Sequence, residues 1–103
     1  MFARMMSCKL NLAKKEDFLE AARRLPNAYK DQAGFVDLLT FVSDDHPDRA
    51  LVFAVWRTKS DSQEFYKHRA PLLDLQPFLE EEQVEHYYLE TSSAFKIGTG
   101  KAA

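Results

Sequence analysis

The segment ALVFAVW at residues 50–56 is apolar at every position and ends in Trp56, the only tryptophan of the chain. A strand that is apolar on both faces needs a covering layer on each side of its sheet. Before it, FVDLLTFV at residues 35–42 is rich in β-branched and aromatic residues, which favour strands. The polar turn SDDHPDR at residues 43–49 joins the two segments. This arrangement predicts a β-hairpin.

The flanking segments add a strand and a helix on either side of this hairpin. Residues 2–12 alternate in polarity, as in a strand with one apolar face. Residues 14–32 have the helical period, and Pro26 is expected to kink or divide that helix. Residues 60–70 predict a second helix with Ser60 or Asp61 as its N-cap, and residues 84–92 predict a fourth strand.

The resulting order, β-α-β-β-α-β, predicts an α+β, ferredoxin-like domain with a four-stranded antiparallel sheet. We expect residues 1–103 to form this single domain, with about residues 94–103 as a flexible C-terminal tail. Two helices cover only one face of such a sheet. We therefore expect a second copy of the chain to cover the other face in a homodimer.

Composition excludes several classes of partner. The chain has 103 residues and a net charge of −2, and its basic residues are dispersed, which argues against nucleic-acid binding. No apolar run approaches a membrane span, and the N-terminus does not resemble a signal peptide, so we expect a cytoplasmic protein without a membrane partner. Cys8 is the only cysteine, and the three histidines are scattered, so no metal site is predicted.

Three stretches resemble the antibiotic biosynthesis monooxygenase (ABM) family of the dimeric α/β barrel superfamily. They are the opening strand FARMMSCKLNL, the Gly-Phe pair at residues 34–35, and VFAVW followed by RTKSDSQEFYKH at residues 52–68. The resemblance covers about nine-tenths of the chain. It implies a small-molecule ligand and a monooxygenase that acts, without a bound cofactor, on a small aromatic or quinol-like substrate.

The family's functional positions match this sequence poorly. The asparagine and tyrosine of the quinol-oxidising branch correspond to Val52 and Ser62, and only Trp56 is retained. The haem-degrading branch needs three residues that are replaced by Cys8, Phe65 and Leu75. Whether the chain is an enzyme therefore stays open, with a non-catalytic small-molecule-binding protein and a haem-binding or haem-degrading protein as the alternatives.

Two residues are candidate catalytic bases. His68, three residues after Phe65 on the second predicted helix, is either a proton shuttle or a solvated surface histidine. Asp37 lies on an otherwise apolar strand, where burial would raise the pKa of its carboxyl group. His86 lies on the last predicted strand and its sequence allows either face.

The candidate ligand pocket centres on Arg4 and the aromatic residues. Arg4 interrupts an apolar strand face, so it either binds an anionic ligand group or pairs with Asp37. Trp56 is either a pocket wall or a core residue, and Cys8 is expected to be a buried, inert thiol. The full set of candidate pocket residues is Arg4, Cys8, Phe41, Trp56, Phe65 and Tyr66.

Overall fold

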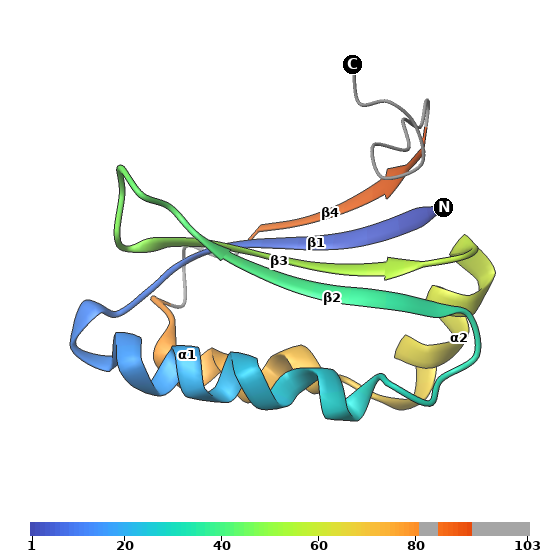
Figure 1. Cartoon of the computed structure of the whole chain (residues 1–103), viewed down its shortest axis with the longest axis horizontal. Helices are drawn as coiled ribbons and strands as arrows, with labels where there is room; N and C mark the ends of the chain where they lie inside the picture. The colour runs from blue at the N-terminus through green and yellow to red at the C-terminus, as the bar shows by residue number, and fades with distance from the viewer. Residues whose placement is uncertain (81–84, 92–103) are drawn as a thin grey trace, which may run out of the picture.

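The computed structural model describes residues 1–80 and 85–91 of the chain (Figure 1). The predicted tail, and the predicted ends of the last strand at residues 84 and 92, lie outside the described residues. Along the chain the elements are β1 (Phe2–Lys9), η1 (Leu12–Lys14), α1 (Lys15–Arg24), η2 (Leu25–Ala28), β2 (Phe35–Val42), β3 (Arg49–Trp56), α2 (Lys59–His68), η3 (Pro71–Phe78) and β4 (Glu85–Glu90), where η marks a 3-10 helix.

The four strands form one antiparallel sheet in the order β2-β3-β1-β4. This is the ferredoxin-like arrangement, so the predicted fold class is confirmed. Figure 1 shows the helical segments gathered on one side of the sheet. The core lies between these two layers, and its most deeply buried large side chains include Trp56, Tyr29 and Phe18.

The alternation of β1 determines which side chains enter that core. Phe2, Met6 and Cys8 are buried toward the helices, whereas the intervening residues are only half-buried. Residues two apart on a strand point to the same face, so Arg4 also projects toward the helical layer. The predicted apolar face of this strand, with Arg4 as its one interruption, is therefore confirmed.

Local chemistry explains where the helices begin and end. α1 ends at Arg24 and continues as the 3-10 segment η2, which has Pro26 in its first turn, so the predicted division of the helix is confirmed. α2 begins at Lys59 because the Thr58 side chain accepts the backbone N–H of Asp61 at 3.1 Å. The predicted N-cap, Ser60 or Asp61, is wrong, and Asp61 instead accepts a hydrogen bond from the Thr58 hydroxyl.

A bulge at the start of β2 reverses the faces of that strand. Phe35 is paired with Trp56, but the next partners in register are Asp37 and Val55, so one residue is left over between them. A strictly alternating strand would place Phe41 on the same face as Phe35. Because the bulge shifts the alternation by one residue, Phe41 lies on the opposite face and its ring packs edge-on against Phe53, 5.9 Å away.

The sheet face opposite the helices is apolar, as the sequence predicted. On this face Phe41 is 52% exposed, and Leu39, Tyr87 and Leu89 are exposed as well. The residues that alternate onto this face from the four strands include Met5, Leu39, Phe41, Leu51, Phe53, Val55, Tyr87 and Leu89. No element of the described chain covers this open face (Figure 1).

Gly34, in the turn before β2, offers a test of the connection to α2. Its φ is +79°, and a Cβ at this position would collide with the Asp61 side chain. We expect Gly34→Ala to lower the free energy of unfolding by about 1–3 kcal/mol, since the alanine would be strained and crowded. Urea unfolding followed by circular dichroism measures this change. The neighbouring Ala33→Ser should shift stability by less than about 0.5 kcal/mol, and an equal effect of both changes would contradict this explanation.

Candidate functional site

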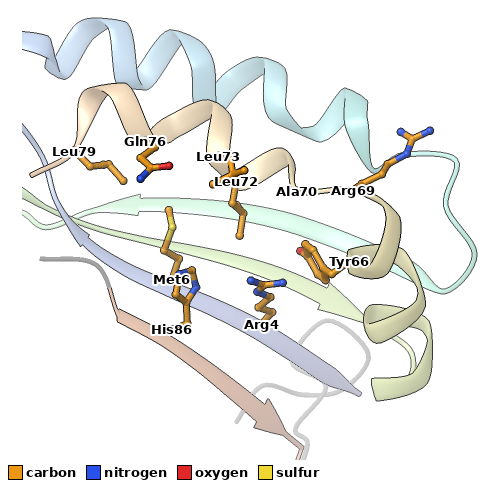
Figure 2. Close-up of a pocket in the computed structure, with 10 residues that line it drawn as sticks. All are labelled: Arg4, Met6, Tyr66, Arg69, Ala70, Leu72, Leu73, Gln76, Leu79 and His86. Atoms are coloured by element: carbon orange, nitrogen blue, oxygen red, sulfur yellow. The ribbon is translucent and has the colours of Figure 1, made fainter. Parts of the chain in front are cut away.

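A cavity of about 370 Å³ lies between the sheet and the helical layer (Figure 2). One wall is formed by residues of the neighbouring strands β1 and β4, and the other by α2 and by η3 with the residues that flank it. Small-molecule sites typically combine such an apolar concavity with a few polar groups. The lining residues are Arg4, Met6 and His86 from the sheet and Tyr66, Arg69, Ala70, Leu72, Leu73, Gln76 and Leu79 from the opposite wall.

Strand register brings the polar groups of the sheet wall together. β1 and β4 are antiparallel neighbours in which Arg4 is paired with Tyr88 and Met6 with His86. Directly paired side chains share a face of the sheet. Arg4 and His86 therefore project toward the same cavity although they are more than 80 residues apart in the sequence (Figure 2).

The guanidinium group of Arg4 is stacked on aromatic rings. Its central carbon lies 4.1 Å from the ring centroid of Tyr66 and 5.7 Å from that of Tyr88. The Nε atom is buried and has no hydrogen-bond partner among the described residues. The two ring contacts stabilise the cation, but a ring offers no acceptor of regular geometry to the buried Nε–H group.

Behind Tyr66 lies a second tyrosine that is completely buried. The hydroxyl groups of Tyr29 and Tyr66 are 2.9 Å apart and share a hydrogen bond. Burial raises the pKa of both phenols, and proximity to Tyr66 raises that of Tyr29 further. Hydrogen bonding to Tyr29 and the charge of Arg4 partly offset the rise in the pKa of Tyr66, so Tyr66 is the more acidic phenol of the pair.

His86 is the residue of the cavity best suited to accept a proton near neutral pH. Partial burial by the cavity walls lowers its pKa, and the nearby charge of Arg4 lowers that pKa further, although part of the side chain stays exposed to solvent. The ordinary histidine pKa is about 6.5, so His86 is neutral at pH 7. A neutral imidazole beside a cation is a suitable general base.

The predicted catalytic residues His68 and Asp37 lie outside this cavity. His68 is on the solvent side of α2, with its Nε2 atom 3.6 Å from a carboxylate oxygen of Glu64. Asp37 lies beyond the bulge of β2, on the open face, and accepts a hydrogen bond from the backbone N–H of Leu38. The expected ion pair between Arg4 and Asp37 is wrong, because these two side chains project from opposite faces of the sheet.

The predicted pocket residues lie in three different places: at the cavity wall, in the core behind it, and on the open face of the sheet. Arg4 and Tyr66 line the cavity. Trp56 and Phe65 pack behind Tyr66, with ring centroids 5.1 Å apart, and the Trp56 indole is fully buried. The indole N–H of Trp56 opposes the rise in the pKa of Tyr66. It makes no hydrogen bond of regular geometry with any described residue. Phe41 lies on the open face, away from the cavity.

Sequence reasoning missed the contributions of Tyr29, Met6, Gln76 and His86. His86 was identified as a strand residue, but its face depends on the register with β1, which no local pattern specifies. Tyr29 reaches the site because Pro26 divides the first helical segment and turns the chain.

Among residues 1–80 and 85–91, no group of three or more histidine, cysteine or acidic side chains is arranged to hold a metal ion. None of the described helices has the length and apolar character required to cross a membrane.

Cys8 is buried beneath the sheet and does not line the cavity. Its thiol donates a hydrogen bond to the carbonyl oxygen of Ala50 at 3.6 Å. Burial raises the pKa of the Cys8 thiol to about 11, although the charge of Arg49 acts in the opposite direction. The reactive thiolate is therefore scarce in the folded protein at neutral pH.

This placement predicts that Cys8 of the folded protein reacts with an aromatic disulfide reagent at about pH 8 at least ~100-fold more slowly than in concentrated urea. The absorbance of the released thiolate measures both rates. Equal rates in the folded and unfolded protein would contradict the buried position of Cys8.

No protein-family model and no curated protein matches the chain. Solved structures do match it. A structure from Nitrosomonas europaea, described as an antibiotic biosynthesis monooxygenase, has a TM-score of 0.74 at 18% identity and covers 90% of this chain and 100% of its own. SnoaB, a cofactor-independent oxygenase from Streptomyces nogalater, has a TM-score of 0.75 at 13% identity and covers 90% of this chain and 94% of its own.

A third structure, from Bacteroides thetaiotaomicron, is described as a possible oxidoreductase. It has a TM-score of 0.72 at 18% identity and covers 87% of this chain and 96% of its own. At these identities the similarity establishes the fold. The chain therefore has the ferredoxin-like fold of the antibiotic biosynthesis monooxygenase structures, as the three sequence stretches predicted.

Proposed function

We propose that the chain is a cofactor-independent monooxygenase that binds a small aromatic, quinol-like substrate in the Arg4 cavity. The observation that carries this proposal is the convergence of a half-buried cation, a neutral histidine and a phenol on one hollow between sheet and helices. The structural similarity to a cofactor-independent oxygenase supports it.

The residues of the cavity have complementary roles in this chemistry. His86 accepts a proton from the substrate, and Arg4 stabilises the resulting anion. Such an electron-rich anion reduces O₂ itself. In the overall reaction one ring C–H group of the quinol becomes C–OH and the quinol is oxidised to the quinone. The second oxygen atom leaves as water with the two hydroxyl hydrogens of the quinol. The electrons come from the substrate, so the reaction balances without a further reductant.

Exchange of His86 provides the test of this proposal. The wild-type protein, treated with a chelator, is expected to accelerate oxygen uptake by at least one member of a panel of hydroquinones and polyphenols above the rate without protein. His86→Gln should lower that rate about 100-fold, because a positioned base contributes factors of this order. The wild-type rate should be maintained at pH 7 and fall only on acidification below the ordinary histidine pKa of about 6.5, because burial and the charge of Arg4 lower the pKa of His86.

His68→Gln is the matched control, since His68 is a solvent-exposed histidine of the same chain. It should leave the rate unchanged. An equal loss in both histidine variants, or a rate that is insensitive to both, would overturn the role of His86. Absence of oxygen uptake across the panel would refute the monooxygenase.

A non-catalytic small-molecule-binding protein is the second candidate. Two buried residues, Val52 and Ser62, stand at the positions of the family's asparagine and tyrosine. Val52 has no polar group that could take part in catalysis, and this observation favours the alternative. Binding of a panel compound without oxygen uptake would be the expected result for this alternative.

We also propose that two copies of the chain associate through their open sheet faces. The face carries large apolar side chains on all four strands, including the half-exposed Phe41, and soluble proteins rarely leave so extensive an apolar surface in water. A second copy offers the same apolar surface, and two-fold pairing of identical faces is the commonest way to bury it.

The mass in solution tests this association. Light scattering at micromolar concentration should give about twice the chain mass of 11.9 kDa. Phe41→Asp should give the monomer, because it introduces a charge into the apolar face. The control is Leu12→Asp, which changes an exposed leucine of the helical layer and should leave the dimer intact. A monomeric wild-type protein would contradict the dimer.

A further inference from the structure

The charge of Arg4 has no carboxylate to balance it within the described chain. Arg4 lies in the apolar row of β1 between Phe2 and Met6, where a cation is costly unless it is paired. The ion pairs among the described residues are all formed by other side chains, and the buried Nε of Arg4 has no partner. Within the described residues, no acceptor therefore compensates the charge of Arg4 at the cavity wall.

The surroundings of Arg4 preorganise it for an external acceptor. The central carbon of the guanidinium lies over the Tyr66 ring, 4.1 Å from its centroid, and 5.7 Å from the ring centroid of Tyr88. Contacts of this kind hold the group in place and leave the N–H donors, which lie in its plane, available. A carboxylate or another planar oxyanion accepts two such N–H groups side by side.

The effect of this charge extends over the cavity. Arg4 lowers the pKa of His86 on β4 and opposes the rise in the pKa of Tyr66 and Tyr29 on the helical side. These effects have the sign expected of a nearby cation. They agree with the geometry, in which no acidic side chain among the described residues lines the cavity.

The shape of the site indicates what else the ligand contains. Opposite Arg4 the cavity is lined by apolar side chains, among them Leu72 and Leu79 (Figure 2). Arg4 and Tyr66 also border a second hollow of about 700 Å³, so the cation lies where the two hollows meet. A flat aromatic framework fits such apolar walls, and its acidic group can lie beside the guanidinium.

From these observations we propose that the cavity selects planar aromatic anions, which bind through an acidic oxygen group at the edge of the Arg4 guanidinium. This inference rests on the proposed function for the location of the site and names the charge of the ligand that the site prefers. It concerns recognition and requires no turnover.

Isothermal titration calorimetry at about pH 7.5 with two matched probes tests the proposal. The probes are 2-naphthoate and its neutral counterpart 2-naphthamide, which have the same rings and nearly the same shape. The wild-type protein should bind the carboxylate roughly 10- to 100-fold more tightly, since charge-assisted hydrogen bonds contribute factors of this order. Arg4→Gln should abolish the preference, and Arg57→Gln, which changes an exposed arginine, should retain it.

Equal affinity of the wild-type protein for the two probes would overturn the proposal, as would an unchanged preference in a folded Arg4→Gln protein. If Arg4→Gln does not fold, as judged by circular dichroism, Arg4→Lys replaces it. That variant keeps the charge but not the two-donor geometry, and it should lose part of the preference. A full preference in Arg4→Lys would overturn the proposed contact.

The proposed monooxygenase activity and the proposed anion recognition can be refuted independently of each other. A preference for naphthoate without oxygen uptake by any panel compound would refute the monooxygenase and support anion recognition. Oxygen uptake that depends on His86, together with equal binding of the two naphthalene probes, would refute anion recognition and support the monooxygenase.

Discussion

The packing of Trp56 against Tyr29 and Phe65 joins three parts of the molecule directly behind the site. The indole belongs to β3, Phe65 to α2, and Tyr29 follows η2, with Tyr29 and Phe65 stacked at 4.9 Å between ring centroids. Aromatic clusters of this kind bury large areas and prefer defined relative orientations. Since Tyr66 directly follows Phe65 in the chain, this cluster also determines where the phenol stands relative to Arg4.

The hydroxyl pair of Tyr29 and Tyr66 connects this core to the cavity surface. Tyr29 has no contact with solvent, and its hydroxyl finds its partner only in Tyr66. A buried hydroxyl that loses its partner is costly, so Tyr66 is held in the orientation in which its ring faces the guanidinium. The position of Arg4 is therefore supported from the core by a chain of two aromatic rings, without an acidic residue.

Much of the fold was predictable from local patterns. The four strands, the antiparallel order and the effect of Pro26 follow from alternation, helical period and the missing proline N–H. The N-cap of α2 was wrong by at least two residues, because Thr58, Ser60 and Asp61 are all capable caps and the sequence does not rank them.

The site was only partly predictable, because two of its determinants are not local. The inward position of Arg4 follows from the alternation of β1, and Tyr66, a predicted pocket residue, lines the cavity. His86 enters the cavity through long-range pairing of β4 with β1, and Phe41 leaves it through a one-residue bulge near Val36. A single inserted or unpaired residue exchanges the two faces of a strand, and composition carries almost no trace of such a shift.

The position of β4 has a consequence for how this scaffold diversifies. β4 is an outermost strand of the sheet, all of its described side chains are exposed, and it contributes His86 and Tyr88 to the surroundings of Arg4. Residues that support folding are concentrated elsewhere, around Trp56. If the proposed ligand binds beside Arg4, substitutions of His86 and Tyr88 change the chemistry of its site while the core around Trp56 stays intact.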